Sequence, residues 1–161
     1  MNATTRTAIV TGASGGIGRA VAGRLARDGF AVVLNYAGNA ANADKAVAEL
    51  RAAGAQALAL KANVADAGEV AQLFKATVEK FGGVDVVVHC AGIMPMRLLA
   101  EDPDLSLFDQ VININLRGSY AVMTTTLPMT TPPASWVDRL VDEAPVQTQN
   151  LAVHPGSVGP R

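Results

Sequence analysis

Residues 11–18 read TGASGGIG, and they directly follow the apolar run TAIV at residues 7–10. A helix that begins right after a strand directs its free N–H groups, and the positive end of its dipole, at one point. Gly12 would permit the tight turn, Gly16 would let the backbone approach a pyrophosphate, and Gly18 would let the helix pack against the strands. The pattern therefore predicts a phosphate-binding turn. A P-loop is excluded because no Gly-Lys-Ser/Thr follows.

The first two-thirds of the chain predicts the elements that would position this turn. Four short apolar runs are typical of strands buried on both faces: TAIV (7–10), AVVLNY (31–36), AQALAL (55–60) and VDVVVHC (84–90). Helical patterns lie between them at residues 17–28, 40–53 and 66–81. Ile17, Val21, Leu25 and Phe30 lie on one side of the first, and Gly54 is expected to end the second. The third has core-facing residues at helical spacing: Val70, Leu73, Phe74, Val78 and Phe81. This alternation predicts an α/β fold, a doubly wound parallel sheet of the Rossmann type with strand order 3-2-1-4 and three α/β/α layers.

A fourth helix is predicted from Ser106 to Leu127, with Asp104 or Ser106 as its cap. The residues spaced to pack on the core are Leu107, Val111, Ile114, Tyr120 and Met123. Residues 128–161 hold six of the eight prolines. We therefore expect a nucleotide-binding domain over residues 5–127, a loosely organised tail over 128–161, and an incomplete C-terminal half of the fold.

Composition excludes several classes of protein. The chain has 161 residues, half of them hydrophobic, and a formal net charge of −1, which gives no electrostatic reason to expect nucleic acid as a partner. A single cysteine, Cys90, rules out an internal disulfide and leaves no CxxC motif for a metal. No apolar stretch is long enough to span a bilayer or to form a signal peptide, so a cytoplasmic location is expected.

Four segments, in order, resemble motifs of the short-chain dehydrogenase/reductase family. TGASGGIGR resembles the cofactor turn Thr-Gly-x-x-x-Gly-x-Gly, and ANVAD (62–66) resembles the segment that borders the adenine. HCAG (89–92) is similar to the family's Asn-Asn-Ala-Gly, and FDQVININLRGSY (108–120) to the helix that carries a catalytic and structural asparagine, here Asn115. Within the family, the segment VVLNYAGN (32–39) is most similar to the 3-oxoacyl-acyl-carrier-protein reductase branch.

The resemblance implies a cofactor site and a reaction. The reaction would be hydride transfer between a nicotinamide and a small-molecule ketone or secondary alcohol. The residues expected to bind the cofactor are Gly12, Ser14, Gly15, Gly16, Ile17, Gly18, Asn35, Tyr36, Ala37, Asn63, Val64, Cys90, Ala91 and Gly92.

The second strand bears on the choice between NADP and NAD. An NAD enzyme usually holds the adenosine ribose with an acid at the end of this strand, but the sequence there is Asn35-Tyr36-Ala37. Because a carboxylate would repel a 2′-phosphate, its absence favours NADP over NAD. Gly15 stands where many NADP-dependent members carry Arg. Arg19 would either reach the phosphate or lie in solvent on the helix.

The family's acid–base residues have no match. A Tyr-x-x-x-Lys pair is required, yet Tyr36 is followed at the fourth place by Ala40 and Tyr120 by Thr124. The serine that orients the substrate is also unmatched. Asn115 is thus the only matched member of the family's four catalytic residues, and without the others its expected role is structural. Two hypotheses stay open: the first is an NADP-dependent oxidoreductase, and the second is a non-catalytic nucleotide-binding remnant or a truncated gene product.

Two further expectations concern the strand at residues 84–90. His89 is expected to act as a hydrogen-bonding substitute for asparagine rather than as a base. With no apolar strand predicted beside it, this strand would be an open edge, so we expect a homo-oligomer formed through that edge, or aggregation.

Overall fold

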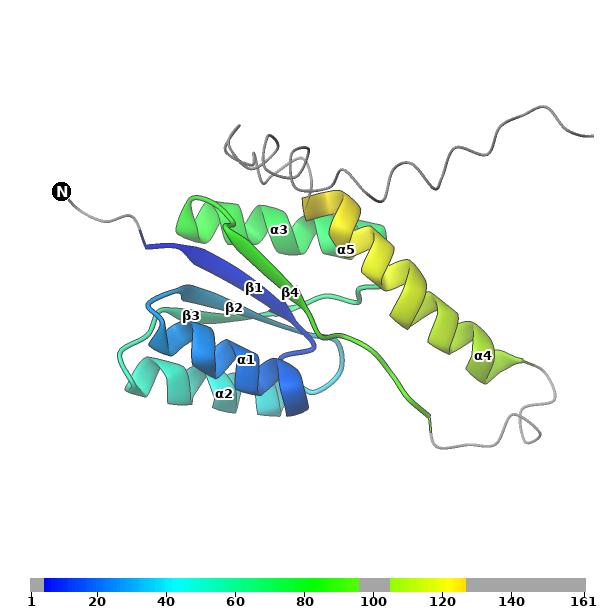
Figure 1. Cartoon of the computed structure of the whole chain (residues 1–161), viewed down its shortest axis with the longest axis horizontal. Helices are drawn as coiled ribbons and strands as arrows, with labels where there is room; N and C mark the ends of the chain where they lie inside the picture. Colours follow the sequence, from blue (N-terminus) through cyan, green and yellow to red (C-terminus); the bar gives the residue numbers. More distant parts are fainter. Residues whose placement is uncertain (1–4, 96–104, 127–161) are drawn as a thin grey trace, which may run out of the picture. The chain divides into compact units, whose positions relative to one another are not determined.

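The computed structural model describes residues 5–95 and 105–126. Four parallel strands form one sheet in the order β3-β2-β1-β4, as predicted (Figure 1). Their bounds are Thr7–Thr11 for β1, Ala31–Tyr36 for β2, Ala57–Lys61 for β3 and Val86–His89 for β4. Ile9, in the middle of β1, pairs with Val33 of β2 and Val87 of β4. The central position of β1 places its carboxyl end, and the glycine turn after it, in the middle of one edge of the sheet.

Helices cover both faces of the sheet and produce the predicted three layers (Figure 1). One face is covered by α1 (Gly16–Arg27) and α2 (Ala40–Ala52), where Ala22 and Val47 pack against Leu34. The other face is covered by α3 (Ala67–Phe81) and α5 (Gly118–Thr126), where Phe74 and Val122 pack against Ile9. Valine, isoleucine and alanine in the strands are buried on both sides, as a parallel sheet between two helical layers requires.

Polar caps and glycines set the ends of two helices. The Asn39 side chain accepts a hydrogen bond from the Asn42 N–H at the start of α2, and the Asp66 carboxylate accepts two at the start of α3. Gly54, predicted to end the second helix, has a φ of 85°, and Gly82 ends α3 with a φ of 87°. These left-handed positions favour glycine, which fixes where each helix stops.

Two residues predicted to face the core lie at the surface. Ile17 is 78% exposed, because it belongs to the first turn of α1, level with the turn after β1 rather than with the sheet. Val78 is 37% exposed, and the fully buried position next to it belongs to Thr77. The Thr77 hydroxyl donates to the Leu73 carbonyl at 2.8 Å, so its burial leaves no hydroxyl without a partner.

The predicted fourth helix is present but contains a π-helical segment. It consists of α4 (Ser106–Val111), a π-helix η2 (Ile112–Arg117) and α5. Ser106 is not its cap: the N-cap position is Leu105, with no side-chain cap bond, and Asp104 lies outside the described residues.

The π segment also changes which side chains face the core. Tyr120 and Met123 were predicted to pack, yet they are 66% and 56% exposed, whereas Ala121 and Val122 are buried. A π-helix has more residues per turn than an α-helix, so the residues after it are rotated relative to an uninterrupted helical pattern. A prediction from a period of 3.6 therefore fails beyond residue 117.

The predicted tail at residues 128–161 lies outside the described residues. Within the described parts of the chain, no helix is both long and apolar enough to cross a membrane.

Candidate cofactor site

The turn between β1 and α1 requires glycine at two positions for different reasons. Gly12 has a φ of 63°, and a Cβ there would lie 2.8 Å from the Ala91 Cα. Gly18 has ordinary helical geometry, but a Cβ on it would lie 2.5 Å from the Gly12 carbonyl oxygen. Close packing of α1 onto the turn is thus possible only without side chains here. This agrees with the roles predicted for both residues.

The start of α1 is open to a ligand. Its N-cap is Gly15, which makes no side-chain cap bond, and no acidic residue lies in the first turn. A Cβ on Gly16 would meet no atom within 4 Å. The first N–H groups of a helix have no intrahelical partner, so this end of α1 can bind an anion with its backbone.

A cleft of about 330 Å³ lies beside this helix end, at the carboxyl ends of the strands. Its lining includes most of the predicted cofactor residues: Gly12, Ser14, Gly15, Asn35, Ala37, Asn63, Val64, Cys90, Ala91 and Gly92. The predicted residues Gly16, Ile17, Gly18 and Tyr36 do not line it. Sequence reasoning did not assign Gly38, Ala62, Ile93 and Ile114 to the cofactor, although the first two and Ile114 lie inside the matched segments and Ile93 directly follows one. None of the lining residues carries a charge.

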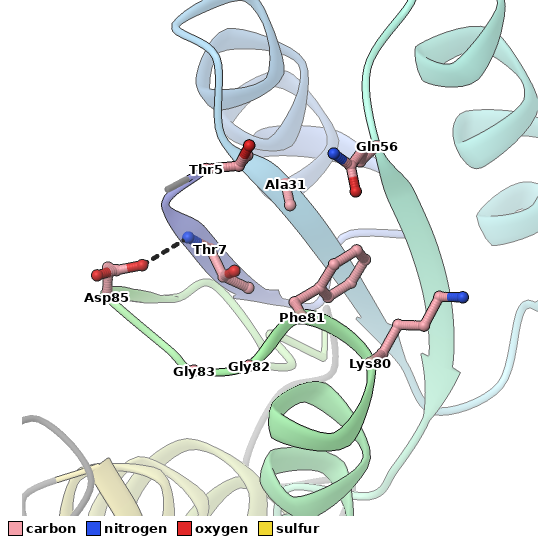
Figure 2. A pocket seen from close by; sticks show the side chains of 9 residues that line it. All are labelled: Thr5, Thr7, Ala31, Gln56, Lys80, Phe81, Gly82, Gly83 and Asp85. Atoms are coloured by element: carbon pink, nitrogen blue, oxygen red, sulfur yellow. Dashed lines mark hydrogen bonds between the residues drawn. The ribbon is translucent and has the colours of Figure 1, made fainter. Parts of the chain in front are cut away.

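A larger cavity, of about 420 Å³, lies at the opposite end of the sheet (Figure 2). Thr7, Ala31 and the residues that follow α3 line it, and the Asp85 carboxylate there accepts a hydrogen bond from the Thr7 N–H at 2.7 Å. Lys80 extends away from Asp85 (Figure 2). Ligands of open parallel sheets bind outside the carboxyl ends of the strands, where helix N-termini converge. We therefore take the cleft of about 330 Å³ as the candidate cofactor site, although the other cavity is larger.

Asn35 connects the cleft to the sheet. Its side chain is buried and donates to the Ala62 carbonyl at 2.9 Å, while its backbone carbonyl accepts from the Ala13 N–H at 2.9 Å. The side-chain amide therefore holds β2 against the loop after β3, and the backbone carbonyl holds the glycine turn against β2. The side chain of this cleft-lining residue thus has a structural role.

The loop after β3 is held by short-range hydrogen bonds. The Asn63 N–H donates to the Glu69 carboxylate at 2.7 Å, and the Asn63 side chain accepts from the Ala65 N–H at 3.1 Å. Val64 is buried, and α5 approaches it so closely that a Cβ on Gly118 would lie 2.8 Å from Val64 Cγ2. This loop is thus fixed beside the cleft, where the resemblance predicts the adenine.

The Thr11 hydroxyl organises the end of β4. It accepts hydrogen bonds from the N–H groups of Cys90 at 3.0 Å and Ala91 at 3.1 Å, and it lies 2.9 Å from His89 Nδ1. Because two donors already use the lone pairs of the hydroxyl oxygen, its own hydrogen points to Nδ1. This network assigns the neutral His89 tautomer with its proton on Nε2.

Burial keeps both His89 and Cys90 uncharged. It lowers the pKa of His89 below its ordinary value of 6.5 and raises the pKa of the Cys90 thiol. His89 Nε2 is buried and has no hydrogen-bond partner among the described residues. The hydrogen bond to Thr11 agrees with the predicted role of His89 in place of an asparagine. The protonated thiol of Cys90, packed against the α1–α2 core, is not a nucleophile.

Asn115 lies in η2 and bonds to the chain just after β4. Its Oδ1 accepts from the Ile93 N–H and its Nδ2 donates to the Ile93 carbonyl, both at 2.8 Å. The side chain thus satisfies both backbone groups of one residue that lines the cleft. This is the structural role predicted for it, and it explains how the fourth helix is tied to the site.

Two exposed side chains do not contribute to the cleft. Met94 is 83% exposed and Tyr120 66% exposed, and neither lines it. Among the residues that the structure describes, no cluster of three or more His, Cys, Asp or Glu side chains could hold a metal ion.

Comparisons with known proteins agree with this geometry. The family model for short chain dehydrogenases matches residues 6–134. The 3-oxoacyl-acyl-carrier-protein reductase FabG of Staphylococcus aureus is 43% identical over 124 residues, which cover 77% of this chain and 50% of that protein. The corresponding reductase of Synechocystis is 46% identical over 121 residues, covering 73% and 47%. This chain belongs to the short-chain dehydrogenase/reductase family.

Solved structures give the same result for the fold. A dehydrogenase/reductase from Sinorhizobium meliloti superposes with a TM-score of 0.74 and 38% identity, covering 79% of this chain and 50% of that one. The F189W variant of actinorhodin polyketide ketoreductase with NADPH gives a TM-score of 0.70 and 34% identity, covering 79% and 48%. The chain spans about half the length of the curated relatives that it matches.

Proposed function

We propose that this chain binds NADP(H) in the cleft at the carboxyl ends of its strands, as the nucleotide-binding part of a 3-oxoacyl-reductase-like oxidoreductase. The observation that carries the proposal is the uncapped N-terminus of α1 above a turn that tolerates no Cβ at Gly12 or Gly18. The likeness to FabG and to a ketoreductase with NADPH supports the class of cofactor.

The chain's own groups suit each part of the dinucleotide. Free N–H groups at the start of α1 would bind the pyrophosphate, and the loop at Asn63 and Val64 would border the adenine. The backbone of residues 90–93, held by Thr11 and Asn115, would form the far wall. When bound, NADPH supplies a hydride for a ketone, or NADP⁺ accepts one from a secondary alcohol.

The absence of a carboxylate from the lining of the cleft favours NADP(H) over NAD(H). No carboxylate lines the end of β2, where one would hold the ribose diol of NAD and repel a 2′-phosphate. Turnover needs, in addition, a proton donor to the substrate oxygen, and the sequence contains no Tyr-x-x-x-Lys. We therefore expect the chain by itself to bind the cofactor without reducing a substrate.

Fluorescence titration of the purified chain with NADPH tests the proposal. Saturable binding that Gly15→Val weakens strongly is expected, because a side chain there would occupy the anion-binding end of α1. Gly15 has an extended φ of −169° that valine can adopt, and a Cβ on it would meet no atom within 4 Å. No saturable binding by a chain that melts cooperatively would contradict it. An acetoacetyl thioester added to the complex then tests turnover through the absorbance of the reduced nicotinamide. A fall in absorbance would show that another group in the chain donates the proton.

A further inference from the structure

An ion pair bridges α1 and α2 next to the cleft. Arg19 Nη2 donates to Glu49 Oε2, and the two side chains are 36% and 51% exposed. Its hydrogen bond with Arg19 holds the pKa of Glu49 below the ordinary value of 4.5. Both residues line a cavity of about 290 Å³ between the two helices. In this structure the Arg19 guanidinium pairs with Glu49 and does not line the cleft.

Arg19 nevertheless lies close to the cofactor cleft. Its backbone N–H donates to the Gly15 carbonyl at 3.2 Å, which places it one helical turn after a residue that lines the cleft. Residues four apart lie on one face of a helix. Strand β2 contributes to both cavities, with Leu34 in the cavity between the helices and Asn35 in the cleft.

A 2′-phosphate at the end of β2 would find no charged side chain among the residues that line the cleft. We propose that Glu49 determines the cofactor preference of this cleft by holding the Arg19 guanidinium away from the 2′-phosphate. The inference rests on the proposed binding of NADP(H) and goes beyond it by naming the residue that limits discrimination between NADPH and NADH.

The Glu49 carboxylate and the 2′-phosphate would compete for the Arg19 guanidinium. An exposed ion pair contributes little stability, so Arg19 can leave Glu49. A phosphate carries close to two negative charges and three acceptor oxygens that suit a guanidinium, which makes it the stronger partner. While Glu49 is charged, it neutralises Arg19 and repels the phosphate as well. Removing that charge frees the guanidinium to bind the 2′-phosphate.

The test compares dissociation constants for NADPH and NADH in wild type, Glu49→Gln, Arg19→Gln and the double variant. Glutamine keeps the size of Glu49 and removes only its charge. Asp28→Asn is the matched control, because Asp28 also pairs with an arginine of α1, Arg24, in an exposed ion pair at the other end of the helix. Adenosine 2′,5′-bisphosphate and AMP, titrated in parallel, isolate the contribution of the 2′-phosphate. Thermal melts establish that each variant folds.

We expect Glu49→Gln to raise the preference for NADPH over NADH by about fivefold, and high salt to reduce the gain. Asp28→Asn should leave the preference unchanged, and the double variant should lose the gain. An equal shift in Glu49→Gln and Asp28→Asn would overturn the inference, since the effect would then be one of net charge. So would a gain that persists without Arg19. If wild type binds neither nucleotide, the proposed function fails and the inference fails with it.

Discussion

Two glycines of α1 differ in what surrounds them, and this difference can be measured. A Cβ on Gly18 would lie 2.5 Å from a backbone oxygen, whereas a Cβ on Gly23, in the same helix, would meet no atom within 4 Å. We expect Gly18→Ala to destabilise the protein by roughly 2 kcal/mol or more, although alanine favours helix, because backbone must move apart.

Gly23→Ala is the control and should stabilise the protein by about 0.5–1 kcal/mol through helix propensity alone. Urea unfolding followed by circular dichroism measures both. Equal effects of the two substitutions would contradict the close approach of α1 to the turn.

His89 should make stability depend on pH. Its pKa in the folded chain is lowered by burial, so below the unfolded value of about 6.5 the unfolded chain binds a proton that the folded chain does not. The contribution of neutral His89 to the free energy of unfolding is therefore complete above pH 6.5. We expect the free energy of unfolding to fall as the pH drops from 6.5 towards the lowered pKa.

Denaturant midpoints measured across this pH range check the expectation. His89→Gln keeps an acceptor for Thr11 and should remove the dependence, whereas His154→Gln, which changes the only other histidine, should retain it. A slope that survives in His89→Gln would assign it to other groups.

The π segment η2 has a local consequence for the site. It carries Asn115, whose two hydrogen bonds fix Ile93 at the wall of the cleft. We expect Asn115→Ala to destabilise the chain by about 1 kcal/mol and to speed amide hydrogen exchange at Ile93. Asn113→Ala, an exposed substitution in the same segment, should leave that exchange rate unchanged. An unaltered rate in Asn115→Ala would mean that the loop is held by other contacts.

Association of the whole molecule is expected from its exposed apolar surface. Ile112, Leu116, Tyr120 and Met123 are exposed at spacings of four, four and three along η2 and α5, and β4 pairs only with β1 among the described strands. Large exposed apolar faces and unpaired strand edges promote self-association. The predicted homo-oligomer remains a prediction.

Sedimentation velocity over a range of concentrations measures this association. Leu116→Glu should shift the distribution towards monomer, because a buried charge opposes contact between apolar faces. Met94→Glu is the control, since Met94 is equally apolar and 83% exposed but lies outside that helix. If Leu116→Glu associates like wild type, the helix face is not the contact, and the edge of β4 becomes the surface to test.

The sequence predicted those features of the fold that depend mainly on residues close together in the chain. The helix-ending role of Gly54 and the glycine turn at Gly12 and Gly18 follow from local periodicity and backbone freedom. The strand order follows from the alternation of strands and helices and the right-handedness of the crossovers. The same reasoning failed where local periodicity changed, at Tyr120 and Met123 after the π segment.

Contacts between distant residues were decided only by the tertiary structure. Arg19 meets Glu49 across 30 residues, and Thr11 meets His89 across 78, and neither pair has a motif or a spacing that would reveal it. Asn35, predicted to bind the cofactor, lines the cleft, but that its amide bonds to Ala62 in the loop after the neighbouring strand could not be read from the sequence. A buried polar group takes whichever partner the packed elements place within reach, and only the assembled sheet and helices fix that choice.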